Sequence, residues 1–191
     1  MKILHLLLLT VMVLINNIGF ANMSTTEFMN ELCLGGVYIN MPYKDIVKQY
    51  GQPTRMEKGQ AQLTGHIMYY GDSVKIYLDR SPERKVIGVM STANNGWNTP
   101  SGIYVGMMMN DAIKIYGNPW RVEQPNKNSR WVTYVYHNAE TRPAGYGVNG
   151  MPLELTINRG IDIEWDKSGD GKIKSIHVWK EEYDPVPASG K

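Results

Sequence analysis

The sequence predicts an α+β protein made of two tandem repeats, each combining a helix with an antiparallel sheet. Three observations lead to this prediction. The segment 36–57 returns 66 positions later as 102–123, and ten of the 22 aligned residues are identical without a gap. Each copy has helical periodicity that ends in a Tyr-Gly-x-Pro sequence. Each copy is then followed by segments in which apolar and polar residues alternate, the pattern of strands with one buried face.

The first 21 residues have the pattern of a cleaved secretory signal peptide. Lys2 supplies a positive charge, residues 3–15 are mostly apolar, and Gly19 and Ala21 are the small residues that a signal peptidase requires. We expect cleavage after Ala21 and a secreted or periplasmic, cell-envelope location. The apolar run is short for a membrane span, so we expect none after cleavage. Retention of this segment as an uncleaved anchor is the alternative.

The composition limits the classes of partner and cofactor. The chain has 20 Lys and Arg against 18 Asp and Glu, which argues against nucleic acid or an anionic membrane as the main partner. Cys33 is the only cysteine, so no intramolecular disulfide can form. No serine lies in a nucleophile elbow, and the glycines do not form a phosphate loop. We therefore expect no cofactor and no catalytic group.

The first repeat is placed at 22–92, after the signal peptide. Ser24 and Glu27 have the spacing of a capping box and predict a short helix over 25–33. A second helix follows Pro42, and Gly51 supplies its end. The alternation of apolar and polar residues then predicts three strands, over 66–70, 74–78 and 86–90.

The second repeat is placed at 102–180, after a turn-rich linker over 93–101 and before a loose tail over 181–191. Asn110 is the expected cap of its helix, and Gly117 the expected end. Strands are predicted over 131–137, 153–157, 161–165 and 173–179.

The second repeat is longer than the first. The final hairpins align at an offset of 87 rather than 66, so the second repeat carries 21 additional residues. We expect most of them in an irregular loop over 138–152. Such a loop is either a functional segment or a solvated hairpin tip, and the sequence favours neither.

One segment resembles part of a calcium-binding loop. Asp166, Ser168 and Asp170 occupy the first, third and fifth ligand positions, and Gly171 occupies the sixth. His177 stands where a bidentate glutamate is required, and the flanking segments are strands. We therefore expect an Asp/Gly turn here and no metal site. His66, His137 and His177 would form a zinc site only if folding brought them together.

Two sets of residues are candidates for function. Acidic side chains alternate on the predicted strands, which indicates a solvated sheet face or, in an enzyme, a glycosidase-like pair; they are Glu154, Asp162, Glu164 and Asp166. Aromatic residues suggest a protein-binding surface. If Ile176 and Val178 are buried, His177 and Trp179 lie on the opposite face. The expected partner-binding residues are Trp97, Tyr146, His177 and Trp179.

The repeat resembles that of the β-lactamase-inhibitor-protein superfamily and of the outer-membrane-assembly lipoproteins of the SmpA/OmlA type. The resemblance covers about 35–179 and is carried by Met41, Tyr50, Gly51 and Pro53 with Met107, Tyr116, Gly117 and Pro119. It implies helices packed on one face of a small antiparallel sheet, and tandem copies as in the inhibitor proteins. The chain lacks the lipidated cysteine of the lipoproteins and the disulfides of the inhibitors, and no inhibitory contact residue can be transferred.

These observations predict an exported, non-catalytic protein that binds another protein through its concave sheet face and neighbouring loops. Inhibition of a β-lactamase is one form of this hypothesis, and it rests on the resemblance alone. The alternatives are a hydrolase of envelope polymers that uses acidic sheet residues, and a structural envelope protein retained by its N-terminal segment.

Overall fold

The computed structural model describes residues 23–183 and 185–187, so the predicted signal peptide lies outside the described residues. The described helices are α2 (Thr25–Glu31), α3 (Tyr43–Tyr50) and α4 (Met109–Tyr116). The strands are β1 (Cys33–Leu34), β2 (Val37–Tyr38), β3 (Arg55–Lys58), β4 (His66–Tyr70), β5 (Val74–Leu78), β6 (Val86–Ser91), β7 (Arg121–Glu123), β8 (Trp131–Tyr146), β9 (Pro152–Asp166), β10 (Ile173–Glu182) and β11 (Val186–Pro187). Within this range no helix has the length and apolar character needed to cross a bilayer.

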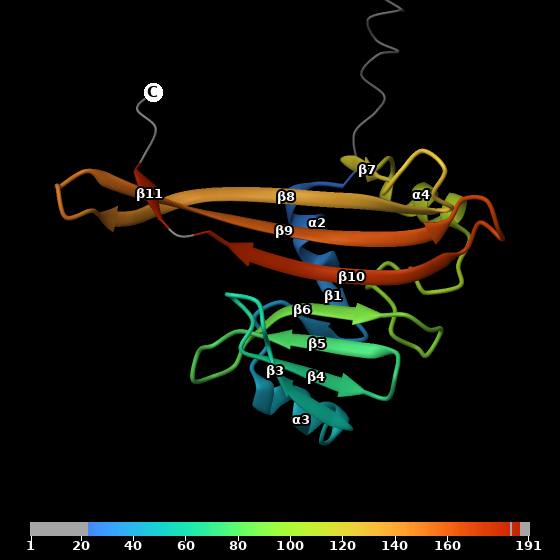
Figure 1. Ribbon diagram of the computed structural model, residues 1–191, viewed down its shortest axis with the longest axis horizontal. Helices are drawn as coiled ribbons and strands as arrows, with labels where there is room; N and C mark the ends of the chain where they lie inside the picture. Colours follow the sequence, from blue (N-terminus) through green and yellow to red (C-terminus); the bar gives the residue numbers. More distant parts are fainter. Residues whose placement is uncertain (1–22, 184, 188–191) are drawn as a thin grey trace, which may run out of the picture.

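A single large sheet runs through both halves of the molecule (Figure 1). Its strand order is β3-β4-β5-β6-β10-β9-β8-β7, β11 pairs with β9, and β1 and β2 form a small separate sheet. All the strand pairs of the large sheet are antiparallel. The last strands of the two halves, β6 and β10, pair with each other at the centre. The predicted α+β class with an antiparallel sheet is confirmed.

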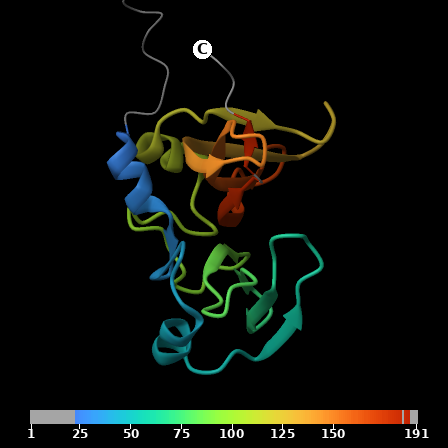
Figure 2. The same ribbon diagram turned by 90° about the vertical axis from the view of Figure 1, so that its left-hand side faces the viewer.

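The three helices lie on one side of this sheet (Figure 2). Alternate strand residues point toward them and are fully buried, including Met68, Ile76 and Val89 in the first half and Ile163 and Val178 in the second. These side chains belong to one continuous core. No helix of the described residues 23–183 and 185–187 covers the opposite face of the sheet, and the alternate side chains of the same strands point toward it.

The two halves of the sheet have the same strand register. The pair Met68↔Ile76 between β4 and β5 corresponds to Tyr134↔Ile163 between β8 and β9, at the offsets of 66 and 87 that the sequence predicts. The contacts between helix and sheet also correspond. The hydroxyl groups of Tyr70 and Tyr136 donate to the carbonyl oxygens at residues 51 and 117, over 2.9 Å and 3.0 Å.

The prediction of an irregular loop over 138–152 is wrong. Strands β8 and β9 stay paired as far as Tyr146 and Pro152, and they form a hairpin that extends well beyond the sheet (Figure 1). We call residues 139–158 the arm. The glycines and proline that suggested a loop lie in the turn at its tip and at the register shift between Pro143 and Tyr146, where a paired hairpin tolerates them.

Two smaller predictions also differ from the structure. Helix α4 is preceded by Met108 rather than by Asn110 as its cap, because the backbone of Met108 is already held by a bridge to Lys172. The corresponding bridge in the first half joins Pro42 to Lys85. Part of the predicted loose tail is ordered, since β10 continues to residue 182 and β11 pairs with β9. The predicted capping box of α2 is confirmed.

Helix α2 is bonded to helix α4 of the second half, although it precedes the first half in sequence. Its Glu31 is buried and accepts a hydrogen bond of 2.6 Å from the hydroxyl group of Tyr116 in α4. The backbone N–H and the hydroxyl group of Ser101 donate to the same carboxylate, over 3.2 Å and 2.7 Å. Burial raises the pKa of Tyr116, so its hydroxyl group stays protonated and remains a donor. The N-terminal helix therefore connects the two halves.

Candidate functional site

The centre of the uncovered face lies where the two halves meet. There β6 and β10 pair with Met90 opposite His177. The His177 ring lies 5.6 Å from that of Tyr77, measured between ring centroids. It also passes over Gly88, where an added Cβ would lie 3.1 Å from His177 Nε2. Burial lowers the pKa of His177 to about 4, so the ring is neutral near pH 7.

A row of aromatic rings starts at Trp179, two residues further along β10. Trp179 pairs with Gly160 on β9, and its indole occupies the space that a side chain there would need, because an added Cβ would lie 2.3 Å from the ring. The Trp179 ring lies 6.1 Å from that of His137 on β8. His137 lies 4.7 Å from the ring of Trp120, which follows α4. We call Trp179, His137 and Trp120 the aromatic row.

Asp162 lies on the same face, opposite His177 in the register of β9 and β10. Burial raises the pKa of Asp162, and the nearby indole of Trp179 opposes this rise. Among the described residues, neither Asp162 Oδ1 nor Trp179 Nε1 has a partner with hydrogen-bond geometry, although both atoms are buried. Both atoms are closed to solvent, and the Trp179 indole stabilises the Asp162 carboxylate, so the two groups interact with each other.

The two edges of this face carry matched charges. Arg55 and Glu57 form an ion pair of 3.0 Å on β3, and Arg121 and Glu123 form one on β7, 66 residues later. Alternation along the strands directs these side chains to the uncovered face. The Arg55 guanidinium also lies 3.9 Å from the ring centroid of Tyr69. Arg121 likewise lies over the ring of Trp120, 5.0 Å from its centroid, so each edge combines an ion pair with an aromatic ring.

The four predicted partner-binding residues do not form one surface. His177 and Trp179 lie together on the uncovered face, as expected if Ile176 and Val178 are buried, which they are. Tyr146 is 78% exposed, near the tip of the arm. Trp97 is on the helix side of the sheet, where it stacks on Tyr50 with ring centroids 4.9 Å apart.

The sequence analysis did not select Tyr77, His137 or Trp120. The alternation of β5 places Tyr77 on the uncovered face once Ile76 is recognised as buried, so this residue could have been found. His137 was considered only as a metal ligand. Trp120 follows a helix and precedes a short strand, and no periodicity in the sequence assigns its direction.

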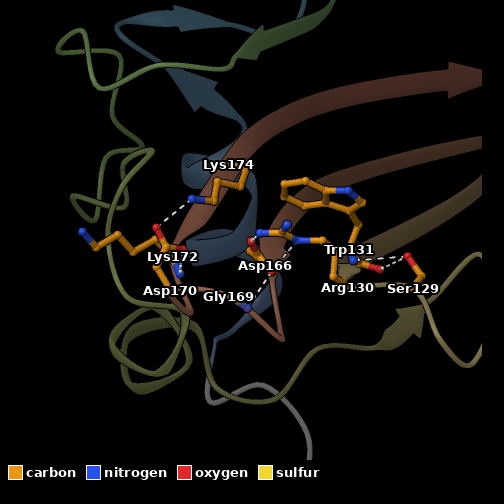
Figure 3. A network of polar contacts seen from close by, with 8 residues as sticks. All are labelled: Ser129, Arg130, Trp131, Asp166, Gly169, Asp170, Lys172 and Lys174. Carbon is orange, nitrogen blue, oxygen red and sulfur yellow. Dashed lines mark hydrogen bonds and ion pairs between the residues drawn. The ribbon is translucent and has the colours of Figure 1, made fainter.

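The calcium-like segment forms a turn held by ion pairs (Figure 3). Arg130 Nε donates to Asp166 Oδ1 over 3.1 Å, and the amide of Gly169 donates to the same oxygen over 2.8 Å. Lys174 pairs with Asp170 over 2.8 Å. These cations lower the pKa of both carboxyl groups, mainly through hydrogen bonds from Arg130 and Lys174.

Both carboxylates that would ligate calcium therefore have basic partners already. Within the part of the chain that the structure describes, no group of three or more His, Cys, Asp or Glu side chains is arranged to hold a metal ion. Of the other acidic candidates, Glu154 pairs in register with Val186 and Pro143 on the arm, away from Asp162.

Comparison with known proteins gives little further information. No protein-family model matches the chain, and no curated protein matches it. Among solved structures, an extracellular protein containing an SCP domain from Bacillus anthracis strain Ames is 11% identical, with a TM-score of 0.40. The match covers 78% of this chain and 50% of that one, so the chain spans about half the length of this protein. These findings do not test the resemblance to the inhibitor and lipoprotein repeats, which stays a prediction.

Proposed function

We propose that the protein is an exported, non-catalytic module that binds another protein through the uncovered face of its sheet. The observation that carries this proposal is the aromatic row, which runs from Trp179 on β10 to Trp120 beside the edge strand β7. Export is supported by the signal-peptide pattern of residues 1–21. β-Lactamase inhibition remains one specific form, suggested by the resemblance of the repeats.

The chemistry of this face suits a protein partner. Trp and Tyr side chains provide large, rigid apolar surfaces at a low cost in conformational entropy, and they dominate many protein interfaces. Trp120 is 52% exposed and therefore has surface left to bury. The exposed Tyr146 on the arm offers a second contact.

We also propose that the two halves arose by tandem duplication of one module. The identical residues of the two segments support this, as do the matched register and the matched bonds from Tyr70 and Tyr136. Because the two modules pair through their last strands, β6 and β10, they share one continuous face, and its two edges, β3 and β7, are equivalent strands. On this proposal the aromatic row belongs to one half only, so the partner would contact the two halves differently.

Quantitative affinity capture from the native envelope or medium tests the binding proposal. Trp120→Ala removes an exposed ring of the aromatic row and should reduce recovery of the specific partner roughly tenfold or more. Tyr38→Ala is the matched control, because Tyr38 is 50% exposed but lies on β2, outside the large sheet. Equal recovery by wild type and Trp120→Ala would contradict the proposed face.

One observation favours the alternative of an envelope-polymer hydrolase. Asp162 is a buried carboxyl group with a raised pKa, and Glu123 and Glu181 add to the rise, which is how a general acid is tuned. Asp162→Asn separates the two functions. A hydrolase would cleave envelope polymers as the wild type and lose that cleavage in this variant, whereas the binding module has no such cleavage to lose. The third alternative, anchoring by an uncleaved signal segment, is tested by sequencing the N-terminus of the mature protein.

A further inference from the structure

A polar hollow at the end of the first half is not part of the uncovered face described above. It has a volume of about 460 Å³ and lies between the β3–β4 connection and the turn after β5. Its lining includes three side chains that are always positively charged near pH 7, Lys58, Arg80 and Arg84, together with His66 and one carboxylate, Asp79. The volume falls in the range of small-molecule sites.

The positive charges of this hollow are not neutralised by nearby carboxylates. Among the described residues, none of the three cations forms an ion pair, whereas both edge arginines and Arg130 do. Asp79 is directed toward its own turn. Its Oδ1 accepts bonds from the backbone N–H groups of Ser81 and Lys85, over 3.0 Å and 2.9 Å, and from the Ser81 hydroxyl group over 2.6 Å.

Beside the hollow, closed off from it, lies a buried polar atom without a partner. His66 Nδ1 has none among the residues that the structure describes. The Arg80 guanidinium donates one bond, to the carbonyl oxygen of Ala61 over 3.1 Å, and retains further N–H groups. The Arg84 guanidinium lies over the ring of Tyr43, 5.7 Å from its centroid, so Lys58 and Arg80 are the principal donors of the site, beside one committed carboxylate.

In the second half, the space that corresponds to this hollow is filled by an arginine side chain. At the offset of 66, Thr64 in the lining of the hollow corresponds to Arg130, whose guanidinium pairs with Asp166 in the turn that corresponds to Asp79 (Figure 3). In the first half no arginine enters from this position. The short side chain of Thr64 leaves the space beside the Asp79 turn open.

We propose that this hollow binds a phosphate group carried by a small polar molecule. Arginine donates two parallel hydrogen bonds to phosphate oxygens, and lysine adds a point charge. The volume exceeds what a phosphate alone would fill, so the remaining space accommodates the attached moiety. This site is independent of the proposed protein-binding face.

Isothermal titration of the purified full-length protein tests the proposal, with inorganic phosphate and glycerol phosphate as the probes at low ionic strength. We expect glycerol phosphate to bind, and we expect Arg80→Gln and Lys58→Gln each to weaken it roughly tenfold, the usual loss for one charge-assisted hydrogen bond. Arg142→Gln, on the arm, is the charge-matched control and should bind as the wild type does. The proposal would be overturned if neither phosphate probe binds, or if Arg142→Gln weakens binding as much as Arg80→Gln and Lys58→Gln do.

A second variant separates a shaped site from general attraction to positive charge. Thr64→Arg copies the second half and adds a charge while filling the hollow. A shaped site predicts that affinity falls by roughly tenfold or more, whereas simple attraction predicts that it rises and would refute the site. Thermal unfolding first confirms that this variant folds, and the glutamine variants provide the test if it does not.

The source of the phosphate is a separate arm of the experiment. Sedimentation with phosphatidylglycerol vesicles, compared with neutral phosphatidylcholine vesicles, tests whether a lipid headgroup enters the hollow. Retention on the anionic vesicles that glycerol phosphate competes away assigns a lipid-borne phosphate. Binding of glycerol phosphate without vesicle retention assigns a soluble one. Both results support the site, and Lys58→Gln must reduce whichever binding is seen.

Discussion

The turns after β5 and β9 have the same backbone arrangement and different surroundings. The amide of Asp79 donates to the carbonyl of Lys85, and the amide of Asp166 donates to that of Lys172, over 2.8 Å and 3.2 Å. The side chain of Asp166 is only 2% exposed and is paired with Arg130. Asp79 instead borders an open hollow that is rich in positive charge.

This difference shows how a shared backbone can acquire separate properties. The register of the strands sets the turn in both halves, and one side chain that precedes the pairing strand decides whether the space beside it is filled. Other matched positions also differ between the halves. Tyr50 and Tyr116 are the same residue with different hydrogen-bond acceptors, whereas Met90 is matched by a different residue, His177. Matched substitutions in the two halves therefore measure what each half has added to the common backbone.

The largest effect is expected at the buried carboxylate beside Tyr116. Glu31→Ala removes the acceptor of three hydrogen bonds and leaves the buried Tyr116 hydroxyl group without a partner, so we expect it to lower the free energy of unfolding by roughly 4 kcal/mol. The first-half control is Gln49→Ala, which removes an exposed donor to the Tyr50 hydroxyl group. Urea unfolding measures both. A loss for Gln49→Ala as large as that for Glu31→Ala would contradict the role of α2 in joining the halves.

A smaller effect, which depends on pH, is expected at the centre of the sheet. The pKa of His177 is about 4 in the folded protein and near 6.5 when unfolded, so below pH 6.5 the unfolded state binds the additional proton. Stability should fall by about 3 kcal/mol between pH 7 and pH 4 from this group alone. His177→Met, which copies Met90, should remove that part of the acid sensitivity. If the wild type and the variant lose the same stability between pH 7 and pH 4, the contribution of His177 to acid unfolding is excluded.

The smallest effect is expected at the filled turn. Arg130→Thr copies Thr64 and leaves Asp166 without its cation, so we expect the melting temperature to fall by a few degrees at pH 7. Because Arg130 lowers the pKa of Asp166, the stabilisation is present above the pKa of the unfolded carboxyl group and is lost as the pH falls through the folded value. The change in melting temperature between pH 7 and pH 2 should therefore be smaller for the variant than for the wild type. Arg142→Thr is the control.

The sequence predicted the parts of the fold that depend on neighbours along the chain. The alternation in 74–78 identified β5, the capping box of Ser24 and Glu27 identified the start of α2, and the glycines at 51 and 117 identified the ends of α3 and α4. For the candidate site, His177 and Trp179 were expected on the face opposite Ile176 and Val178 if those two are buried, but apolar residues on both faces of 173–179 left the register open. Each of these signals comes from periodicity or from backbone conformation within a few residues.

Only the tertiary structure decided how these elements meet. No local signal specifies that β6 pairs with β10, that α2 packs on the second half, or that Trp97 stacks on Tyr50 on the helix side. Pairing and packing depend on which apolar surfaces become buried together across long sequence separations. For the same reason the sequence determined that two similar segments exist, whereas the fold decided that the first retains an open basic hollow and the second is closed by Arg130.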